Sequence, residues 1–328
     1  MKILVTSKSF GQHNPAAIAM LERHGFEIIR SDITNPSAAD IRRQIHNCDV
    51  LVVGNDPVDL SVIEAAERLK LIHMHGTGLD AIDVDAATQR NILVANVPGA
   101  NKNAVAELTV LMMLALGRQL YTHINMVKTG SWKRQAGNEV SNSTVGIIGM
   151  GNIGRRVAEL LSGFNVSIIA YDPFVEQAGA ENQGIAFFSN CDDVFRNADW
   201  IVLSLPLTEQ TMCLVNDHTL SLMKRTAYLI NTARGGLVDE QALCRAVQNK
   251  QIAGAALDVF TEEPPAMDSP LRSADIMMTP HIGATSIETS ALVSQNVAQN
   301  IIDIVIHKNT NIAVNAVKIQ SISGGIYA

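Results

Sequence analysis

The sequence predicts an α/β protein built from two doubly wound parallel-sheet domains. Its 328 residues are enough for two domains of ordinary size. Short apolar runs alternate with amphipathic runs along most of the chain, which is typical of parallel strands covered by helices. A glycine-rich stretch with the pattern G-x-G-x-x-G follows an apolar run near the middle of the chain, and it indicates a strand that turns directly into a helix.

The first hundred residues alternate regularly between predicted strands and predicted helices. We expect strands at residues 3–6, 27–30, 50–53, 71–74 and 93–95, and helices at 15–24, 38–45, 61–68 and 84–90. Pro15 and Pro36 lie near helix starts, where a missing N–H costs little, and Gly25 suits the position after a helix end. This segment therefore predicts one parallel sheet with helices packed on it.

The turn-rich stretch from Asn96 to Asn101 predicts a domain boundary, and a long helix is expected at about residues 103–121. The apolar run of this helix, within residues 108–116, is interrupted by Thr109 and is too short to span a bilayer. We therefore expect the helix to be buried against protein, another subunit included. Residues 130–140 predict a polar loop with Trp132 as its anchor.

A second alternating region begins at the glycine-rich stretch. Strands are expected at residues 145–148, 166–170, 185–188, 200–205, 227–231, 255–259 and 276–279, and a long helix at 286–307. The tail from Asn309 is less regular. The chain shows no internal repeat and no low-complexity tract, so the two alternating regions account for the fold.

The stretch Gly149-Met150-Gly151-Asn152-Ile153-Gly154 has the chemistry of a dinucleotide-binding turn. Gly149 permits the tight turn, Gly151 lets a pyrophosphate approach the backbone, and Gly154 lets the helix pack close to the strand. The phosphates are expected on free N–H groups at the helix start, Asn152 and Ile153 included, where the helix dipole favours anions. The pattern alone is weak, because glycine-rich turns between strand and helix are common.

Asp172 strengthens this interpretation, because it lies 18 residues after Gly154 at the end of the next strand. An acidic residue at this spacing binds the ribose hydroxyls of NAD. The alternative is an ordinary turn residue before Pro173. NADP requires an arginine nearby for its 2′-phosphate, whereas this chain has Asp172-Pro173-Phe174, so the sequence favours NAD.

Composition argues against several classes of protein. The net charge is −7 and the pI about 5.7, without a basic run, so neither a nucleic acid nor a membrane is an expected partner. The nine histidines show no metal-ligand spacing, so no metal is expected, and the N-terminus is a predicted strand and not a signal peptide. Isolated cysteines favour reduced thiols in a cytoplasmic protein. They are Cys48, Cys191, Cys213 and Cys244.

Polar residues collect after the predicted strands of the second domain, at the sheet edge where open parallel sheets bind ligands. Pro206 and Thr208 follow the fourth strand, Asn231 to Gly236 the fifth, Asp258 to Pro264 the sixth and Thr279 to Gly283 the last. Arg234, Glu263 and His281 are therefore expected to converge on one edge, beside the nicotinamide.

These three side chains suit hydride exchange between nicotinamide and C2 of a 2-hydroxy or 2-keto acid. Histidine, with an ordinary pKa of about 6.5, can give or take the hydroxyl proton. A carboxylate beside it stabilises the imidazolium, and an arginine can hold the substrate carboxylate. Singly, Arg234 could be a surface ion pair, Glu263 a loop residue and His281 a satisfied core histidine. Their joint position at neighbouring strand ends makes these alternatives less probable.

In the first domain, the stretch Gly76-Thr77-Gly78 follows a predicted strand, and its backbone N–H groups could hold a carboxylate. The alternative is an ordinary turn between strand and helix. His73 and His75 alternate along that strand and face the same side, and we interpret both as structural and not catalytic.

With these motifs in place, the chain resembles the D-isomer-specific 2-hydroxyacid dehydrogenases, and most of all their phosphoglycerate dehydrogenase branch. The resemblance extends from the first strand to about His307. The matching motifs are Gly76-Thr77-Gly78-Leu79-Asp80, the glycine-rich stretch, Asn231 to Gly236, Asp258-Val259-Phe260 with Glu263-Pro264, and Pro280-His281-Ile282-Gly283.

The resemblance implies a Rossmann cofactor domain, residues 101–286, inserted into a flavodoxin-like substrate domain made of residues 1–100 and 287–328. Arg234 would bind substrate, Glu263 would pair with His281, and His281 would be the acid/base. Asp258 would hold the nicotinamide amide. Further cofactor contacts would come from Pro206, Thr232, Ala233 and Gly283, and substrate contacts from Gly76, Thr77, Gly78 and Asn101. The helix after Asn101 would form a homodimer interface, and no C-terminal regulatory domain is expected.

The leading hypothesis is an NAD-dependent dehydrogenase of a D-2-hydroxy acid, with D-3-phosphoglycerate as the first candidate. Lys8, after the first strand, could hold its distal phosphate, or could simply be solvated. A second reading is an NADPH-linked glyoxylate or hydroxypyruvate reductase. Formate dehydrogenases lack the Glu–His pair and are disfavoured. A non-enzymatic reading is a dinucleotide-sensing protein like the corepressors that share this fold.

Overall fold

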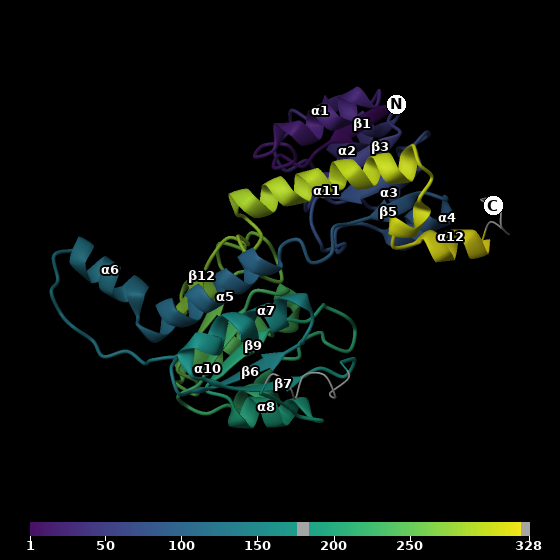
Figure 1. Ribbon diagram of the computed structural model, residues 1–328. Coiled ribbons are helices and arrows are strands. Elements are labelled where there is room, and N and C mark those ends of the chain that lie inside the picture. Colours follow the sequence, from purple (N-terminus) through teal and green to yellow (C-terminus); the bar gives the residue numbers. More distant parts are fainter. Residues whose placement is uncertain (176–183, 323–328) are drawn as a thin grey trace. The chain divides into compact units, whose positions relative to one another are not determined.

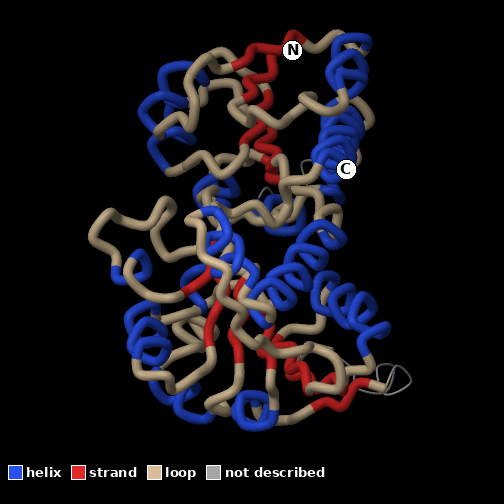
Figure 2. Tube along the Cα trace, turned by 90° about the vertical axis from the view of Figure 1, so that its left-hand side faces the viewer, coloured by secondary structure: helices blue, strands red, loops and turns tan. Residues whose placement is uncertain are grey.

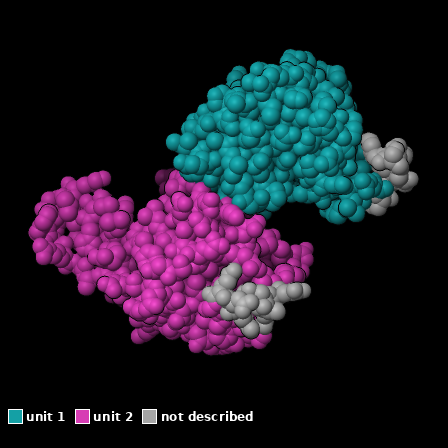
Figure 3. Space-filling model, in the orientation of Figure 1, with its two compact units in different colours: residues 1–101, 284–328 teal, residues 102–283 magenta. Residues whose placement is uncertain are grey.

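The computed structural model describes residues 1–175 and 184–322 of the chain. The chain forms two compact units, which Figure 3 colours separately. Unit 1 consists of residues 1–101 and 284–328, and unit 2 of residues 102–283. Unit 2 is thus continuous in sequence, whereas unit 1 is assembled from the two segments that flank it. The sequence-based boundaries lie within a few residues of these.

Unit 1 contains a parallel sheet of five strands in the order β2-β1-β3-β4-β5. Its strands are β1 (Lys2–Val5), β2 (Glu27–Arg30), β3 (Val50–Val53), β4 (Leu71–Met74) and β5 (Leu93–Ala95), drawn in red in Figure 2. They lie at the positions predicted from the sequence. The strand order is that of flavodoxin-like folds, as the resemblance implied.

Alternate side chains of these strands face two different helix layers. Ile3 and Val5 pack toward α1 (Pro15–Arg23) and α11 (Ile287–Val305), two helices that are labelled in Figure 1. Leu4 and Leu51 pack toward the opposite layer, formed by α2 (Ala38–Ile45), α3 (Leu60–Ala65) and α4 (Val84–Gln89). The period of two in a strand produces this division. The second segment of unit 1 ends with η6 (Thr310–Ile312) and α12 (Ala316–Ile322).

Unit 2 contains a parallel sheet of seven strands in the order β12-β11-β10-β9-β6-β7-β8. The strands are β6 (Thr144–Ile148), β7 (Ser167–Tyr171), β8 (Ile185–Phe187), β9 (Trp200–Leu203), β10 (Tyr228–Asn231), β11 (Gly254–Leu257) and β12 (Ile276–Met278). This is the Rossmann order extended by one strand, and the chain reverses direction across the sheet between β6 and β9. Parallel α/β sheets bind ligands outside the strand ends at such a reversal.

Helices cover both faces of this second sheet. One layer consists of α5 (Lys102–Gly117) and α7 (Asn152–Leu161), which bury Val145, Ile147 and Val202. The other consists of α8 (Cys191–Asn197), α9 (Asp217–Leu222) and α10 (Glu240–Gln248), which bury Ile201 and Leu229. A last helix, α6 (Leu120–Lys128), projects from the body of the unit and has no buried residue (Figure 1).

Two predictions for the segment after Asn101 were wrong. The single helix expected at 103–121 is two helices, α5 and α6, bent by 62° at a break where Gln119 takes left-handed backbone angles. Gly117 is the last residue of α5, and a Cβ there would lie 2.9 Å from the Trp200 ring, so glycine lets this end of the helix pack against the ring. Trp132 is not an anchor, because it is 79% exposed. Backbone bonds hold this loop instead, such as the one from Asn138 N–H to Gly117 O at 2.7 Å.

Two further features concern membrane-spanning helices and metal-binding clusters. Within residues 1–175 and 184–322, no single helix is long and apolar enough to cross a membrane, although the bent pair α5–α6 passes that test by length and composition together. Over the same ranges, no group of three or more His, Cys, Asp or Glu side chains is arranged to hold a metal ion.

Candidate active site

The turn after β12 carries His281 and is held by a buried carboxylate. Asp258, 1% exposed at the end of β11, accepts hydrogen bonds from Ile282 N–H and Gly283 N–H, both at 2.8 Å, and from the Thr279 hydroxyl. His281 N–H donates to Asp258 O at 2.9 Å. His281 has a φ of +51°, a conformation that L-residues rarely adopt, and the Asp258 bonds hold it there. This clamp fixes the direction of the imidazole.

Glu263 joins the histidine to the neighbouring loop. Its Oε2 lies 2.7 Å from Nδ1 of His281, and its Oε1 accepts the Phe260 N–H at 3.0 Å. Both carboxylate oxygens therefore have donors, so the side chain is fixed against the imidazole. The sequence predicted this pairing, and the structure places the two side chains together.

The pair shifts the pKa of each partner toward its charged form. The hydrogen bond that His281 donates to Glu263 raises the pKa of His281, and the carboxylate charge adds to this, while burial works against it. For Glu263, burial alone would raise the pKa, but hydrogen bonds from His281 and Phe260 N–H and the positive charge of Arg234 together lower it. A histidine poised in this way can hold a proton near neutral pH and release it to a substrate oxygen.

Arg234 lies on the turn after β10, which Asn231 shapes. Asn231 is fully buried; its Nδ2 donates to Arg234 O at 2.8 Å and its Oδ1 accepts from Ala233 N–H at 3.0 Å. Gly235 follows, and a Cβ there would lie 1.9 Å from the carbonyl carbon of Phe260, so only glycine lets the two loops touch. Arg234 is near enough to Glu263 for its positive charge to help lower the pKa of that carboxyl. The predicted trio is therefore one cluster within unit 2.

The glycine-rich stretch forms the predicted turn between β6 and α7. Gly149 has a φ of +96°, and a Cβ there would lie 2.3 Å from Ser204 O; a Cβ on Gly154 would lie 2.1 Å from Gly149 O. At Gly151 an added Cβ would meet no atom within 4 Å. Gly151 caps α7 without a side-chain hydrogen bond, and both Gly151 and Asn152 are exposed. This open backbone at a helix N-terminus fits a pyrophosphate.

Asp172, at the end of β7, also contacts this turn. Its Oδ2 accepts from Met150 N–H at 2.8 Å and its Oδ1 from Phe174 N–H at 2.9 Å. The carboxylate thus connects the phosphate-binding turn to the position expected for the ribose. Pro206, after β9, is exposed, and its carbonyl accepts from the Thr211 hydroxyl at 2.8 Å.

In unit 1, the structure brings together most of the predicted substrate-binding residues. The Thr77 hydroxyl lies 3.1 Å from Val97 O and 3.2 Å from Oδ1 of Asn101, and Asn96 Nδ2 donates to Thr77 O at 2.6 Å. Gly76, Thr77 and Gly78 are partly exposed, so the turn can present its backbone to a ligand. Lys8 is exposed, and its Nζ donates to the Thr34 hydroxyl after β2.

His73 in β4 and His75 directly after it both contact α11, so they face the same side, which is consistent with the structural role expected from the sequence. His73 is fully buried and contacts Asn300 Nδ2 at 3.1 Å. His75 lies between the hydroxyls of Ser9 and Ser294, at 3.0 Å from each. Burial lowers the pKa of each histidine to about 4, so both rings are neutral near pH 7.

Sequence reasoning missed some residues that shape this site. Thr109 of α5 is fully buried, and its hydroxyl lies 2.8 Å from that of Thr232. The only sequence signal was its interruption of an apolar run. Asn231 belonged to a recognised motif, but its hold on the Arg234 turn depends on side-chain geometry that no spacing reveals.

The profile described as "D-isomer specific 2-hydroxyacid dehydrogenase, NAD binding domain" matches residues 110–283. The chain belongs to this family. Its match falls on unit 2, which carries the glycine-rich turn, Asp172 and the trio. The match to the family's NAD-binding domain therefore falls on the same unit in which the cofactor-binding residues were predicted.

Relatives extend the family assignment to unit 1. The chain is 39% identical to the D-3-phosphoglycerate dehydrogenase of Methanocaldococcus jannaschii over 92% of its own length and 57% of that protein. It spans less than two thirds of the length of such curated relatives. Its fold matches the D-lactate dehydrogenase of Aquifex aeolicus complexed with NAD and lactic acid, with a TM-score of 0.83 and 26% identity, covering 96% of this chain and 99% of that one. It also matches a glyoxylate reductase from Paecilomyes thermophila, with a TM-score of 0.82 and 29% identity, covering 93% and 95%.

Proposed function

We propose that this protein is an NAD-dependent oxidoreductase that interconverts a D-2-hydroxy acid and its 2-keto acid. The observation that carries the proposal is the contact of 2.7 Å between Glu263 and His281, beside Arg234, in a chain of this family. Histidine, carboxylate and arginine are the side chains that proton exchange and carboxylate binding require.

NAD, when bound, supplies the hydride acceptor or donor. The chain's own residues do the rest. His281 has its Nδ1 committed to Glu263, so proton exchange with the substrate oxygen falls to Nε2. Glu263 stabilises the imidazolium in the acid form, and Arg234 binds the substrate carboxylate. Asp258 holds the turn that carries His281 by accepting hydrogen bonds from Ile282 N–H and Gly283 N–H.

D-3-phosphoglycerate is the first substrate to test, because the curated relatives carry the name D-3-phosphoglycerate dehydrogenase. A role in serine biosynthesis depends on that substrate. The glyoxylate reductase among the similar structures makes glyoxylate and hydroxypyruvate the second candidates. The test is NADH oxidation against a panel of 2-keto acids, with 3-phosphohydroxypyruvate among them. A protein that binds NADH but reduces none of them would support the corepressor-like alternative.

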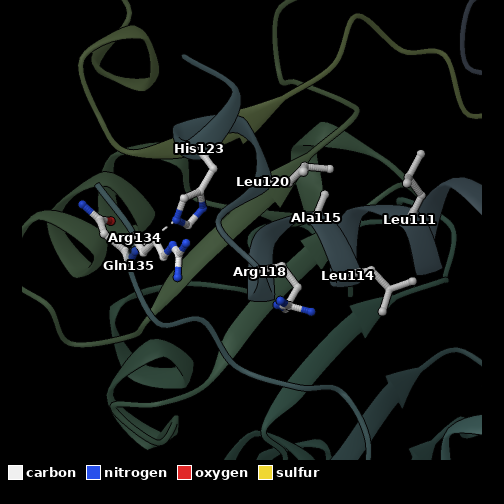
Figure 4. Close-up of a pocket in the computed structure, with 8 residues that line it drawn as sticks. All are labelled: Leu111, Leu114, Ala115, Arg118, Leu120, His123, Arg134 and Gln135. Atoms are coloured by element: carbon white, nitrogen blue, oxygen red, sulfur yellow. Dashed lines mark hydrogen bonds between the residues drawn. The ribbon is translucent and has the colours of Figure 1, made fainter. Parts of the chain in front are cut away.

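We also propose a homodimer formed through α5 and α6. Apolar side chains on and beside these helices are exposed, including Leu111 (55%), Tyr121 (68%), Val127 (57%) and Trp132 (79%). A pocket of about 530 Å³ lies between the two helices and the following loop, and Figure 4 shows the residues that line it. It is lined by Leu111, Leu114, Ala115, Arg118, Leu120, His123, Arg134 and Gln135. Burying this surface against a second copy removes apolar area from water.

The oligomeric state can be measured by light scattering after size exclusion. We expect twice the chain mass for the wild type and a monomer for Tyr121→Glu with Val127→Glu, since α6 buries nothing within its own chain. A monomeric wild type would contradict the proposal. We further propose a cytoplasmic location, in keeping with four free thiols.

A further inference from the structure

Thr109 is a buried polar residue inside the apolar helix α5. It is 0% exposed, and its hydroxyl has two neighbours, Val105 O at 2.8 Å and the Thr232 hydroxyl at 2.8 Å. A hydroxyl has one proton to give, and a carbonyl can only accept. The Thr109 proton therefore goes to Val105 O.

The direction of the second bond follows from the first. Since Thr109 has no further proton, the Thr232 hydroxyl must donate to Thr109 Oγ1. Thr232 is the first residue after β10 and is 8% exposed. Its proton points into the unit, so this hydroxyl cannot donate to a bound ligand, and its side chain is fixed in one rotamer.

The same helical turn of α5 underlies the neighbouring turn of the site. A Cβ on Gly283 would lie 3.5 Å from the Val105 side chain, so Val105 is in contact with this turn. Gly283 N–H is bonded to Asp258, the residue that holds His281. One turn of α5, from Val105 to Thr109, thus supports both the Thr232–Arg234 turn and the His281–Gly283 turn.

We propose that Thr109 is a positioning residue for NAD binding, acting through Thr232. The inference rests on the proposed NAD-dependent function. Loss of its hydroxyl leaves the buried Thr232 proton without an acceptor, and the turn from Thr232 to Arg234 must move to satisfy it. In the wild type, the observed conformation of this turn gives both buried hydroxyls a hydrogen-bond partner.

The test measures NADH dissociation constants by fluorescence titration, a readout independent of turnover. Thr109→Val preserves shape and removes the acceptor. We expect its Kd for NADH to rise about five- to tenfold, the effect of one buried hydrogen bond. The KM for the keto acid should also rise through Arg234, with a smaller change in kcat. Thr109→Ser keeps the hydroxyl and should restore the Kd.

Thr88→Val is the matched control. Thr88 is also a buried helical threonine, 3% exposed, which donates to the carbonyl four residues earlier, Val84 O, and accepts from Asn315. It lies in α4 of unit 1, outside the NAD-binding unit. Its loss should lower the Tm to a similar degree and leave the NADH Kd unchanged. An equal rise in Kd for both variants would reduce Thr109 to a general stability effect and overturn the inference.

Thr232→Val completes a double-mutant cycle. Both single variants break the same hydrogen bond, so the double variant should bind NADH no more weakly than either one. Additive losses would show that the two residues act separately and would overturn the inference, as would an unchanged Kd in Thr109→Val. If Thr109→Val fails to fold, the Kd for NADH is compared between the double variant and Thr232→Val instead. The double variant leaves no hydroxyl unpaired. A wild type that binds no NADH would overturn the proposed function as well.

Discussion

Nδ1 of His281 lies 2.7 Å from Oε2 of Glu263, and the two side chains are 35% and 34% exposed. The pair is thus buried enough for the carboxylate to act on the imidazole, yet open enough for a substrate to reach it. Each partner holds the other in its charged form. This relationship leads to the first three predictions.

Glu263→Gln should shift the pH dependence of the rate. Without the carboxylate, the pKa of His281 falls from its raised value, because burial then dominates. Reduction of a keto acid needs the protonated histidine, so its rate falls as pH rises through this pKa. We expect that descending limb to move to lower pH in the variant, measured as kcat/KM against pH. A limb at the same pH would remove Glu263 from this role.

The same pair predicts a pH window of stability. The folded pKa of His281 is raised, so its contribution is complete below the unfolded value of 6.5 and lost as pH rises through the folded pKa. The folded pKa of Glu263 is lowered, so its contribution is complete above 4.5 and lost as pH falls through its folded pKa. The Tm difference between wild type and Glu263→Gln should therefore be largest between pH 4.5 and 6.5. A difference that is flat across pH 3 to 9 would contradict it.

His281→Ala should abolish most of the turnover while sparing the fold. General acid–base catalysis commonly supplies about 10²–10⁴-fold, and kcat should fall by that order. NADH binding should persist, because the cofactor turn at Gly149 to Gly154 is built by β6 and α7 and not by the His281 loop. Fluorescence titration of NADH checks the second part. A variant with near-wild-type kcat would assign the proton transfer to another group.

Asp172 predicts a preference for NAD over NADP. Its carboxylate is fixed beside the phosphate-binding turn by Met150 N–H and Phe174 N–H, where it would repel a 2′-phosphate and accept a hydrogen bond from a free ribose hydroxyl. We expect kcat/KM to be higher with NADH than with NADPH. Asp172→Ala should reduce the ratio of the two kcat/KM values. Equal use of the two cofactors by the wild type would count against it.

Lys8 tests the length of the substrate. If its ammonium holds a distal phosphate, Lys8→Ala should raise KM about tenfold for 3-phosphohydroxypyruvate, the worth of one charge-assisted contact, and leave glyoxylate unaffected. Arg43→Ala, another exposed cation of unit 1 on α2, serves as a control for net charge. In the structure Lys8 donates to Thr34, so binding a phosphate requires it to exchange this partner. Equal effects on long and short substrates would reject the idea.

The sequence predicted the elements of the fold well where the pattern is local. The strands of unit 1 and the turn at Gly149 follow from apolar runs and glycine spacing, which act within a few residues. The helix break at Gln119 and the exposure of Trp132 could not be predicted from the local sequence pattern. From the sequence, Gly117 looked like an ordinary helical residue. Glycine is needed there because the Trp200 ring lies beside it, and Trp200 is 83 positions later in the chain.

The candidate site shows the same division. Arg234, Glu263 and His281 could be grouped because each follows a predicted strand, and parallel strands end at one edge. The threefold use of the Asp258 carboxylate and the bond from Thr232 to Thr109 depend on rotamers and on packing between distant segments. Periodicity carries no information on either.

The two-segment construction of unit 1 has a consequence for synthesis on the ribosome. Its strands are complete once β5 has emerged at Ala95, but α11, one of the two helices that pack on Ile3 and Val5, begins only at Ile287. All of unit 2 is made in between and, being continuous, can fold as soon as Gly283 is out. One apolar face of the first sheet therefore lacks one of its two covering helices while nearly two hundred further residues are added. The incompletely covered apolar face makes that nascent chain more prone to aggregation than the finished protein.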